Sequence, residues 1–444
     1  MGRLSSALAE LRNYPSAIIG LGIIAFLVGL AVYTVVVIPY DDALDKWRGG
    51  DQWRLYPVNA SPVWSDRLLG GQAPETKVVS SRDAEIEREA FEGGERLSIP
   101  LRVDFQAGDF PSEMTVFFDA DGHEREPFAR LVWRTPDGRE MPLGGSRISR
   151  QDRMSISQDR ALEQRLGLVP HIGLLATPDS EPGDARVQTG EYELTLDVIV
   201  FEENADFEAE LVLYGRVHGL AGTDHQRRDL MVALMWGTPV ALAFGLLAAV
   251  GTTITTLIIA ATGVWFGGWV DATIQRLTEV NMILPLLPIL VMVGTLYSTS
   301  IWLMLGVVVA LGIFSAGIKM YRAMLLPIRQ APYIEAARAY GAGNTRIILR
   351  YMIPRILPVL IPTFVTLIPT FVFLEASLAV LGLGDPVLPT WGKVLNDAQS
   401  ESALYSQYYY WVLSPAFLLM LTGLGFAMLG FALDRIFNPR LRTL

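Results

Sequence analysis

The segment YIEAARAYGAG, residues 333–343, lies between two long apolar blocks in a chain of 444 residues. From 319 to 355 the chain carries seven Lys or Arg residues and a single acidic residue, Glu335. Pro332 can occupy the first position of a helix because its missing N–H needs no partner there. Gly341 can end that helix at its C′ position. The segment therefore predicts a short helix between two membrane spans, with small residues that let another surface approach closely.

Long apolar runs dominate the chain on both sides of this segment. The first, residues 16–38, is uncharged and exceeds the roughly 20 residues that cross a bilayer. It ends without a small-residue cleavage site, which favours a retained anchor helix over a signal peptide. Five further spans are predicted at 238–262, 282–297, 301–325, 356–381 and 410–433. The predicted fold class is a polytopic α-helical membrane protein with six transmembrane helices.

The charges beside the spans predict the topology. Arg3 and Arg12 precede the first span and acidic residues follow it, so residues 1–15 are expected in the cytoplasm. Six spans return the C-terminus to the same side, and they place the basic loop 319–355 in the cytoplasm as well. We therefore expect a multi-pass membrane protein with both termini in the cytoplasm.

A second kind of composition follows the first span. Residues 40–229 hold 37 of the 46 acidic residues and 22 of the 36 basic ones, so this region is strongly acidic. We expect residues 40–222 to form an extracytoplasmic, mainly β domain, built as a sandwich and inserted after helix 1. A short helix is predicted near 158–167. Alternation of apolar and polar residues predicts strands at 97–105, 192–201 and 207–217.

Several kinds of chemistry lack their motifs. The absence of cysteine excludes disulfides and thiolate metal sites. No Gly-x-x-x-x-Gly-Lys-Ser/Thr loop is present, so no ATP site is expected on this chain. No basic patch coincides with a soluble, aromatic surface, so no nucleic-acid partner is expected. No catalytic residue and no metal site are predicted, because the histidines lack helical metal spacing: His123, His171, His218 and His225.

Two carboxylates near the membrane remain to be interpreted. Glu375 is the one acidic residue well inside a predicted span, and a charge there is costly. It is either a functional residue of a pathway or a structural carboxyl that is hydrogen-bonded within the helix bundle. Asp271 and Arg276 are expected to pair across helix turns.

From the residues alone, segment 333–343 is equally well an ordinary connecting loop or a docking helix. The sequence EAARAYGA followed by RIILRYMIPRILP resembles the Glu-Ala-Ala (EAA) loop of ABC importer permeases. In that family this loop is the coupling helix, which docks into a cleft on the ATP-hydrolysing subunit. The resemblance implies that the ATPase-coupling residues here are Glu335, Ala336, Ala337, Arg338, Gly341 and Pro354. From their types, Asn344 or Thr345 is expected to cap a second short helix that stops at Pro354.

The resemblance extends over about 222–444. Further motifs occur in the order and spacing of the dipeptide/oligopeptide permease family, at 222–229, 267–280, 374–386, 389–395 and 433–442. The layout is similar to the second, C-type permease of that family's pair and implies a type I ABC importer fold, with 223–444 as a five-helix core. It also implies an external gate motif at Gly222, Thr223 and Asp224. Pathway or subunit-packing candidates are Glu375, Gly382 and Gly384.

The family resemblance implies a function and a set of partners. The chain would be a non-catalytic permease subunit of an ATP-driven importer for peptides or similar small solutes, in the cytoplasmic (inner) membrane of a prokaryote. Its partners would be a homologous second permease, two ABC ATPase subunits that bind ATP and Mg, an extracytoplasmic substrate-binding protein and the lipid bilayer. The sequence departs from the family at Arg227, where Gly is usual, at Tyr351, where His is common, and in the large 40–222 domain.

Two other functions compete with this one. An ion-coupled secondary transporter would need coupling carboxylates at mid-membrane, and Glu375 is the one such residue. A membrane receptor with an external sensor domain would need a cytoplasmic output domain, whereas the predicted inside loops are short.

Overall fold

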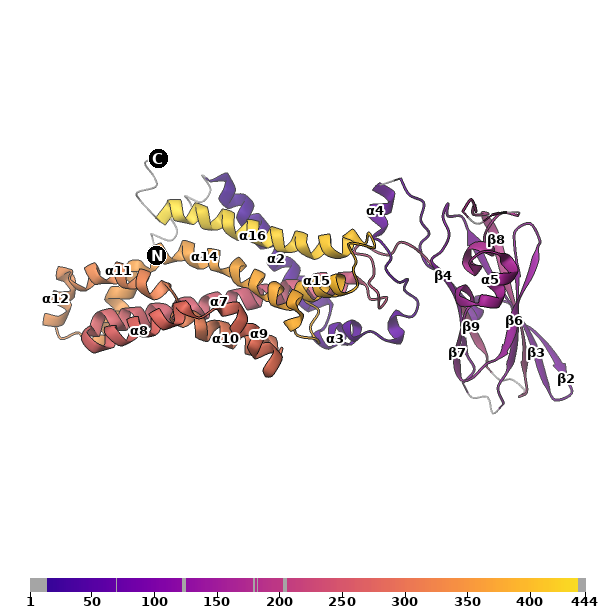
Figure 1. Cartoon of the computed structure of the whole chain (residues 1–444), viewed down its shortest axis with the longest axis horizontal. Helices are drawn as coiled ribbons and strands as arrows, with labels where there is room; N and C mark the ends of the chain where they lie inside the picture. The colour runs from indigo at the N-terminus through magenta and orange to yellow at the C-terminus, as the bar shows by residue number, and fades with distance from the viewer. Residues whose placement is uncertain are drawn as a thin grey trace. The chain divides into compact units, whose positions relative to one another are not determined.

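The computed structural model describes residues 14–68, 70–121, 125–178, 180–181, 183–202 and 206–437. It divides into a membrane unit, formed by the chain up to Arg48 and from Val232 onward, and a β unit from Gly49 to Met231 (Figure 1). The residues Arg3, Arg12 and His123 and the motif end at 438–442 lie outside the described residues.

The boundaries of the units differ from the expected 40 and 222. Helix α3 (Tyr40–Arg48) belongs to the membrane unit. Its Tyr40 ring meets Trp236 edge-on at 5.7 Å, and Leu44 packs against an apolar cluster of the membrane helices. This amphipathic helix therefore extends the membrane unit beyond the first span.

Four helical runs among the described residues are long and apolar enough to cross a membrane. They are α2 (Pro15–Val37), α7 (Leu230–Phe266), the run Asn344–Leu383 and α16 (Tyr409–Phe437). Two bent pairs raise the number to six if each pair is one span. They are α8 (Gly268–Ile283) with α9 (Leu286–Leu296), bent by 76°, and α10 (Ile301–Ile313) with α11 (Gly317–Arg329), bent by 44°. The predicted helical membrane fold with an inserted β domain is confirmed.

The predicted spans at 282–297 and 301–325 fall within the two bent pairs, the first containing α9 and the second containing α10 and most of α11. At the first break, Pro285 caps α9 and cannot donate a hydrogen bond to the preceding turn. At the second break, the Asn281 amide donates to the carbonyl oxygens of Leu311 at 2.9 Å and Phe314 at 3.2 Å. A polar side chain thus takes over carbonyl groups that the broken helix leaves free.

Glycines allow the first and last described spans to pack closely. Figure 1 shows α2 lying along α16. A Cβ on Gly20 would lie 2.7 Å from the carbonyl oxygen of Gly425, and a Cβ on Gly425 would lie 2.7 Å from the Ile23 side chain. Small residues at such an interface let helix backbones approach each other in a membrane.

The run Asn344–Leu383 contains two wide turns. It consists of α13 (Asn344–Ile347), the π turn η4 (Ile348–Met352), α14 (Ile353–Leu378) and the π turn η5 (Ala379–Leu383). The prediction that the helix stops at Pro354 is wrong. Pro354 lies in the first turn of α14, directly after η4. A π turn shifts the i→i−4 pattern, so the proline ring meets no helical carbonyl that would force the chain to end there.

The β unit is built from two antiparallel sheets. One has the strand order β1-β9-β4-β7 and the other β2-β3-β8-β5-β6. The strands are β1 (Lys77–Ser80), β2 (Glu87–Phe91), β3 (Gly94–Phe105), β4 (Glu113–Asp119), β5 (Phe128–Arg134), β6 (Glu140–Arg147), β7 (Gln151–Ser155), β8 (Gly190–Val200) and β9 (Glu208–Tyr214). The strands predicted at 97–105, 192–201 and 207–217 correspond to β3, β8 and β9.

One apolar core lies between these two sheets. Alternate residues of β8, from Tyr192 to Val200, are fully buried, and so are Met114 and Val116 of β4 in the other sheet. The predicted short helix is α5 (Arg160–Leu166), and the Asp159 side chain caps it by accepting from Ala161 N and Leu162 N. The period-2 pattern thus marks the face that each strand turns toward the core.

The remaining short elements connect strands and spans. They are α4 (Val63–Leu68), α6 (Pro170–Gly173), α12 (Pro332–Ala339), α15 (Trp391–Ser400) and the 3₁₀ turns η1 (Asp51–Trp53), η2 (Ser81–Asp83) and η3 (Ile156–Gln158).

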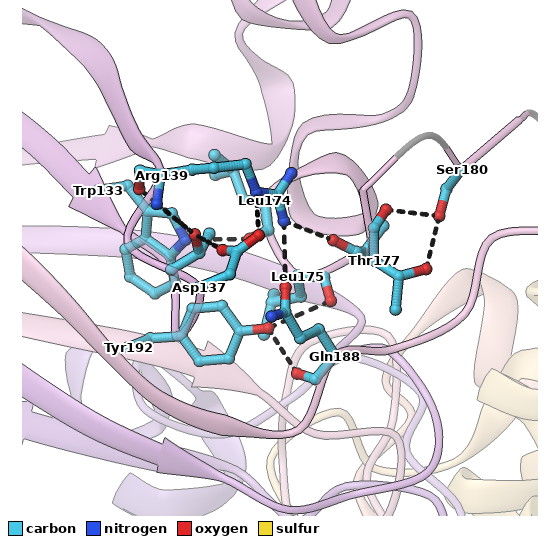
Figure 2. Close-up of polar contacts among 11 residues, drawn as sticks. Trp133, Asp137, Arg139, Leu174, Leu175, Thr177, Ser180, Gln188 and Tyr192 are labelled. Atoms are coloured by element: carbon cyan, nitrogen blue, oxygen red, sulfur yellow. Dashed lines mark hydrogen bonds and ion pairs between the residues drawn. The ribbon is translucent and has the colours of Figure 1, made fainter.

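A polar network fastens segment 174–188 to the sandwich (Figure 2). The Trp133 indole donates to Leu174 O at 3.0 Å, and the Tyr192 hydroxyl donates to Gln188 O at 2.5 Å. The Arg139 guanidinium donates to Asp137 at 2.7 Å and to the Gln188 side chain at 3.1 Å. Because these polar groups form hydrogen bonds with one another, we interpret the network as stabilising the fold and not as a site for catalysis or binding.

Candidate functional site

Helix α12 forms the tip of the membrane unit in Figure 1 and contains four of the predicted coupling residues, Glu335 to Arg338. Gly341 follows the helix, and Pro354 lies in α14. Pro332 lies in its first turn, as predicted. At its end, Gly341 has φ +80°, its N–H donates to Arg338 O at 2.9 Å, and Ala342 N–H donates to Ala337 O at 3.0 Å. This pair of bonds is the Schellman arrangement, which a glycine in the left-handed region adopts without steric cost.

The two faces of α12 have different surroundings. Ile334 is 1% exposed and joins the apolar cluster formed by the ends of α7, α11 and α14, and Ala337 beside it is buried. Glu335 and Ala336 are exposed, and Tyr340 is 92% exposed. The two alanines of the motif are thus separated: Ala337 packs inside this chain, and Ala336 faces outward.

A cationic side chain fixes α12 to the end of α7. The Arg338 guanidinium lies over the indole ring of Trp265, 4.2 Å from its centroid, and Trp265 is buried near the end of α7. Such a cation–π contact contributes about 0.5–2 kcal/mol. Arg338 therefore belongs to the attachment of α12, although its sequence position is in the middle of the motif.

Helices α8 and α11 are joined by a forked ion pair. Nε and Nη2 of Arg322 donate to the two carboxylate oxygens of Asp271 at 2.7–3.0 Å. The expected pairing of Asp271 with Arg276 is wrong, since Arg276 instead lies 3.3 Å from Glu279. Residues five apart do not face each other on a helix, whereas a residue from another helix can reach across.

The structure places Glu375 in the interior of the membrane unit. The residue is 6% exposed, and its carboxyl group lies close to the Thr390 side chain. Its Oε2 atom has no hydrogen-bond partner among the residues that the structure describes. Thr390 also accepts from Lys393 N at 3.2 Å at the start of α15. Glu375 thereby connects α14 to the cap of α15.

Gly382 and Gly384 are required by the backbone. Gly382 has φ +82° inside η5, a conformation that favours glycine. A Cβ on Gly384 would lie 2.8 Å from the Cβ of Ala379, which is closer than real Cβ atoms approach. Both glycines let the chain turn sharply after the span.

The motif Gly222-Thr223-Asp224 lies in a buried, hydrogen-bonded turn of the β unit. Thr223 Oγ1 donates to Pro57 O at 2.7 Å and accepts from Ala60 N at 2.9 Å. Asp224 is fully buried, forms an ion pair with Arg228 at 2.5 Å and accepts from Gln226 N at 2.8 Å. These bonds hold the end of the β unit just before α7 begins.

The departure at Arg227 has a structural counterpart. Arg227 has φ +65°, so this position adopts the left-handed conformation that favours glycine. Its guanidinium donates to Tyr56 O at 2.7 Å and to Glu113 at 2.6 Å, and it lies 4.2 Å over the ring of Tyr214. These contacts offset the backbone strain of a non-glycine residue.

A cavity of about 700 Å³ in the membrane unit was missed by sequence reasoning. It lies beside the break between α10 and α11, and Thr253 Oγ1 is buried there without a partner in the described chain. Hydroxyl and amide side chains in an otherwise apolar wall are the signal that could have revealed it. The polar lining residues are Thr252, Thr253, Thr256, Asn281, Ser315, Tyr321 and Thr363.

Within the described ranges, no three His, Asp or Glu side chains gather in a way that could hold a metal ion.

Comparison with known proteins identifies the family. Residues 241–443 match the family model described as binding-protein-dependent transport system inner membrane component. The glutathione transport system permease protein GsiD of Pectobacterium atrosepticum is 31% identical over 226 residues, which cover 50% of this chain and 73% of that protein. The chain belongs to the family of binding-protein-dependent transport system inner membrane components. It is a permease subunit of an ABC importer, a non-catalytic multi-pass component of a bacterial inner-membrane transport system.

Other relatives of the permease carry related names. The dipeptide transport system permease protein DppC of Alkalihalophilus pseudofirmus is 28% identical over 227 residues, 50% of this chain and 72% of that protein. A solved chain from a study of carbohydrate-binding modules of the β-sandwich superfamily covers 36% of this chain and 62% of its own length. Its TM-score of 0.15 and identity of 14% are too low to support an argument.

The family match bears on the competing functions. A component of a binding-protein-dependent transport system works with a binding protein and an ATPase, so a stand-alone secondary transporter and a receptor are both set aside. The family model covers α12 and the cavity beside α10. It does not cover the β unit.

Proposed function

We propose that this permease forms one half of the translocation pathway for short peptides or similar small solutes. A homologous second permease would supply the other half, an extracytoplasmic binding protein would deliver the solute, and two ABC ATPase subunits would bind ATP and Mg. The names of the glutathione and dipeptide permeases among its relatives support this solute class. The cavity of about 700 Å³ is large enough for such a solute, and its hydroxyl groups offer hydrogen bonds to peptide groups.

The proposed orientation places both termini and loop 319–355 in the cytoplasm and the β unit outside. The seven basic residues of this loop support it, because Lys and Arg accumulate on the cytoplasmic side of membrane proteins. The orientation also places residues 40–229, which carry a surplus of acidic residues, outside the cytoplasm.

Helix α12 is proposed as the element that docks on an ATPase subunit. Its exposed face offers Glu335, Ala336 and Tyr340, and the small Ala336 side chain allows a partner's groove to approach the backbone. Its opposite face is anchored by Ile334 in the same cluster as Trp265 of α7 and Ile356 of α14. A force on α12 is therefore transmitted directly to the ends of these helices.

Glu375 is proposed to be structural, joining α14 to α15 through Thr390. The buried turn at Gly222, Thr223 and Asp224 is proposed to stabilise the external end of the pathway, because its hydrogen bonds fix the chain that leads into α7. Gly382 and Gly384 are proposed to shape the turn after α14.

The observation that carries the docking proposal is the outward-facing Ala336 on an anchored helix. The test is purification of the tagged protein from its native membranes in mild detergent, with identification of the chains that copurify. Wild type should recover a second permease and P-loop ATPases. Ala336→Trp should lose the ATPases, because the indole fills the space that the groove needs.

The matched control is Ala25→Trp, which places the same side chain at an exposed alanine of α2. It should retain the ATPases. Recovery of ATPase subunits in equal amounts with both variants would refute docking through Ala336, and their absence from the wild-type complex would refute the importer assembly itself.

A further inference from the structure

The outer face of the four-stranded sheet in the β unit carries a set of polar side chains. In β4, Met114, Val116 and Phe118 point into the core, so Thr115 and Phe117 point to the opposite face. The strand register then adds two further residues to that face. It pairs Phe117 with Arg153 and Thr115 with Ser155, and paired residues share a face.

Two segments from outside the sheet form walls over this face. Arg54 forms an ion pair with Glu210 at 2.9 Å, and its guanidinium lies 5.3 Å from the centre of the Phe117 ring. Arg227 is held by Glu113 and by the ring of Tyr214, as described above. Both walls are therefore fixed in place by charged contacts to the sheet.

The walls and the sheet enclose an open cavity of about 620 Å³, which is within the size range of small-molecule sites. Its lining is mainly polar. The residues that the argument uses are Asp51, Arg54, Gln151, Arg153, Gln158 and Arg227.

These lining residues differ in whether their polar groups already have partners. Arg54 and Arg227 are each paired with a glutamate. The Arg153 guanidinium makes no hydrogen bond or ion pair with any residue that the structure describes, and the same holds for the side-chain amides of Gln151 and Gln158. The carboxylate of Asp51, a further lining residue, also lacks an ion pair within those ranges.

The free groups define the missing ligand. The Arg153 side chain is exposed and accessible to a ligand, and a guanidinium can bind a carboxylate through two parallel hydrogen bonds. The neighbouring amides match peptide-like N–H and C=O groups, and Asp51 offers an acceptor for an amine. We propose that this cavity binds a short peptide with a free C-terminal carboxylate, held by Arg153, Gln151 and Gln158, with its amino end toward Asp51.

This site is independent of the proposed docking of α12, because every lining residue belongs to the β unit. It gives the permease a solute site of its own, in addition to any site on a separate binding protein. It lies in the part of the chain that the family model does not cover.

The experiment is isothermal titration of the full-length protein in detergent with four probes: dialanine, glutathione, dialanine amide and N-acetyl-dialanine. Dialanine or glutathione should bind saturably at concentrations up to about 10 mM. Dialanine amide, which lacks the carboxylate, should bind on the order of 10-fold more weakly than dialanine. N-acetyl-dialanine should retain carboxylate binding and report the contribution of the amine.

Arg153→Gln should weaken dialanine binding on the order of 10-fold and abolish the difference between the acid and its amide. The matched control is Arg150→Gln. Arg150 lies on the neighbouring turn with 82% of its side chain exposed, outside the cavity, and it should leave binding unchanged.

Two results would overturn the proposal. One is the absence of saturable binding of both dialanine and glutathione to wild type, which would make the cavity a hydrated groove. The other is equal binding of the acid and the amide to wild type. That second comparison needs no variant, so it decides the question even if Arg153→Gln fails to fold.

Discussion

Adjacent residues of the coupling motif have opposite environments. Ala336 and Ala337 are identical in the sequence and both belong to the resemblance, yet only Ala337 is buried. We predict that Ala337→Leu lowers the stability of the membrane unit, since added methyl and methylene groups in a packed site cost about 1–3 kcal/mol. Ala336→Leu should leave stability within about 0.5 kcal/mol.

Thermal unfolding of the two purified variants in the same detergent measures this difference. A lower midpoint for Ala337→Leu alone is the expected result. Equal midpoints would mean that α12 is not packed through Ala337. The pair also separates folding from docking, because Ala336→Leu removes no contact within the chain.

At the level of single residues, the sequence predicted where α12 begins and ends, because Pro332 and Gly341 act through local backbone geometry. It could not distinguish the two alanines. Their difference depends on α7, α11 and α14 packing on one side of the helix, and that packing is set by residues far away in the chain.

Between helices, the forked contact of Arg322 with Asp271 is the main charged link from α8 to α11. We predict that Arg322→Lys destabilises the membrane unit by about 1 kcal/mol, because an ammonium group keeps the charge and loses the two parallel bonds. Asp271→Asn should cost a similar amount.

A double-mutant cycle tests this link. Arg322→Lys combined with Asp271→Asn should cost less than the sum of the two single changes, because both remove one interaction. Additive losses would show that the two side chains act independently. Lys319→Arg, at a more exposed pair with Glu279, is the control and should change little.

For whole elements, strands were predictable and breaks in helices were not. Alternation within β3 and β8 is a local pattern that directly reports the buried face. The bend near Phe314 involves Asn281, which supplies hydrogen bonds from another helix. The same limit explains Pro354, where a preceding π turn removes the reason for the helix to end.

For the molecule as a whole, the β unit should lose stability in mild acid. Burial lowers the pKa of His171 and of His218 below the ordinary value of 6.5. The unfolded chain then binds protons more readily than the folded one. The stability that these neutral rings provide is complete above pH 6.5 and is lost as the pH falls through the lowered pKa values.

Thermal unfolding between pH 8 and pH 5, followed by the β-sheet circular dichroism signal, measures this loss. The double variant His171→Gln and His218→Gln should show a shallower decline below pH 6.5 than wild type, with the two curves parallel above it. A variant whose decline is as steep as that of wild type would assign the acid sensitivity to other groups.

The polar cavity of the β unit could not be predicted from the sequence. The family resemblance concerns 222–444 and reaches only Gln226 and Arg227 among the lining residues. Arg153 joins Phe117 through strand pairing, and Arg54 and Arg227 come from opposite ends of the unit. The register of the sheet places Arg153 beside Phe117, and the ion pairs of Arg54 with Glu210 and of Arg227 with Glu113 hold the other two side chains against the sheet.

The two ends of the β unit are joined to each other by hydrogen bonds. Asn59 N–H donates to Asp224 O at 3.1 Å, and Ala60 N–H donates to Thr223 Oγ1 at 2.9 Å. A compact segment whose ends already meet can enter or leave a host loop without stretching it. In evolutionary terms, a single insertion after the first span suffices to give an ordinary permease this module, and a single deletion suffices to remove it.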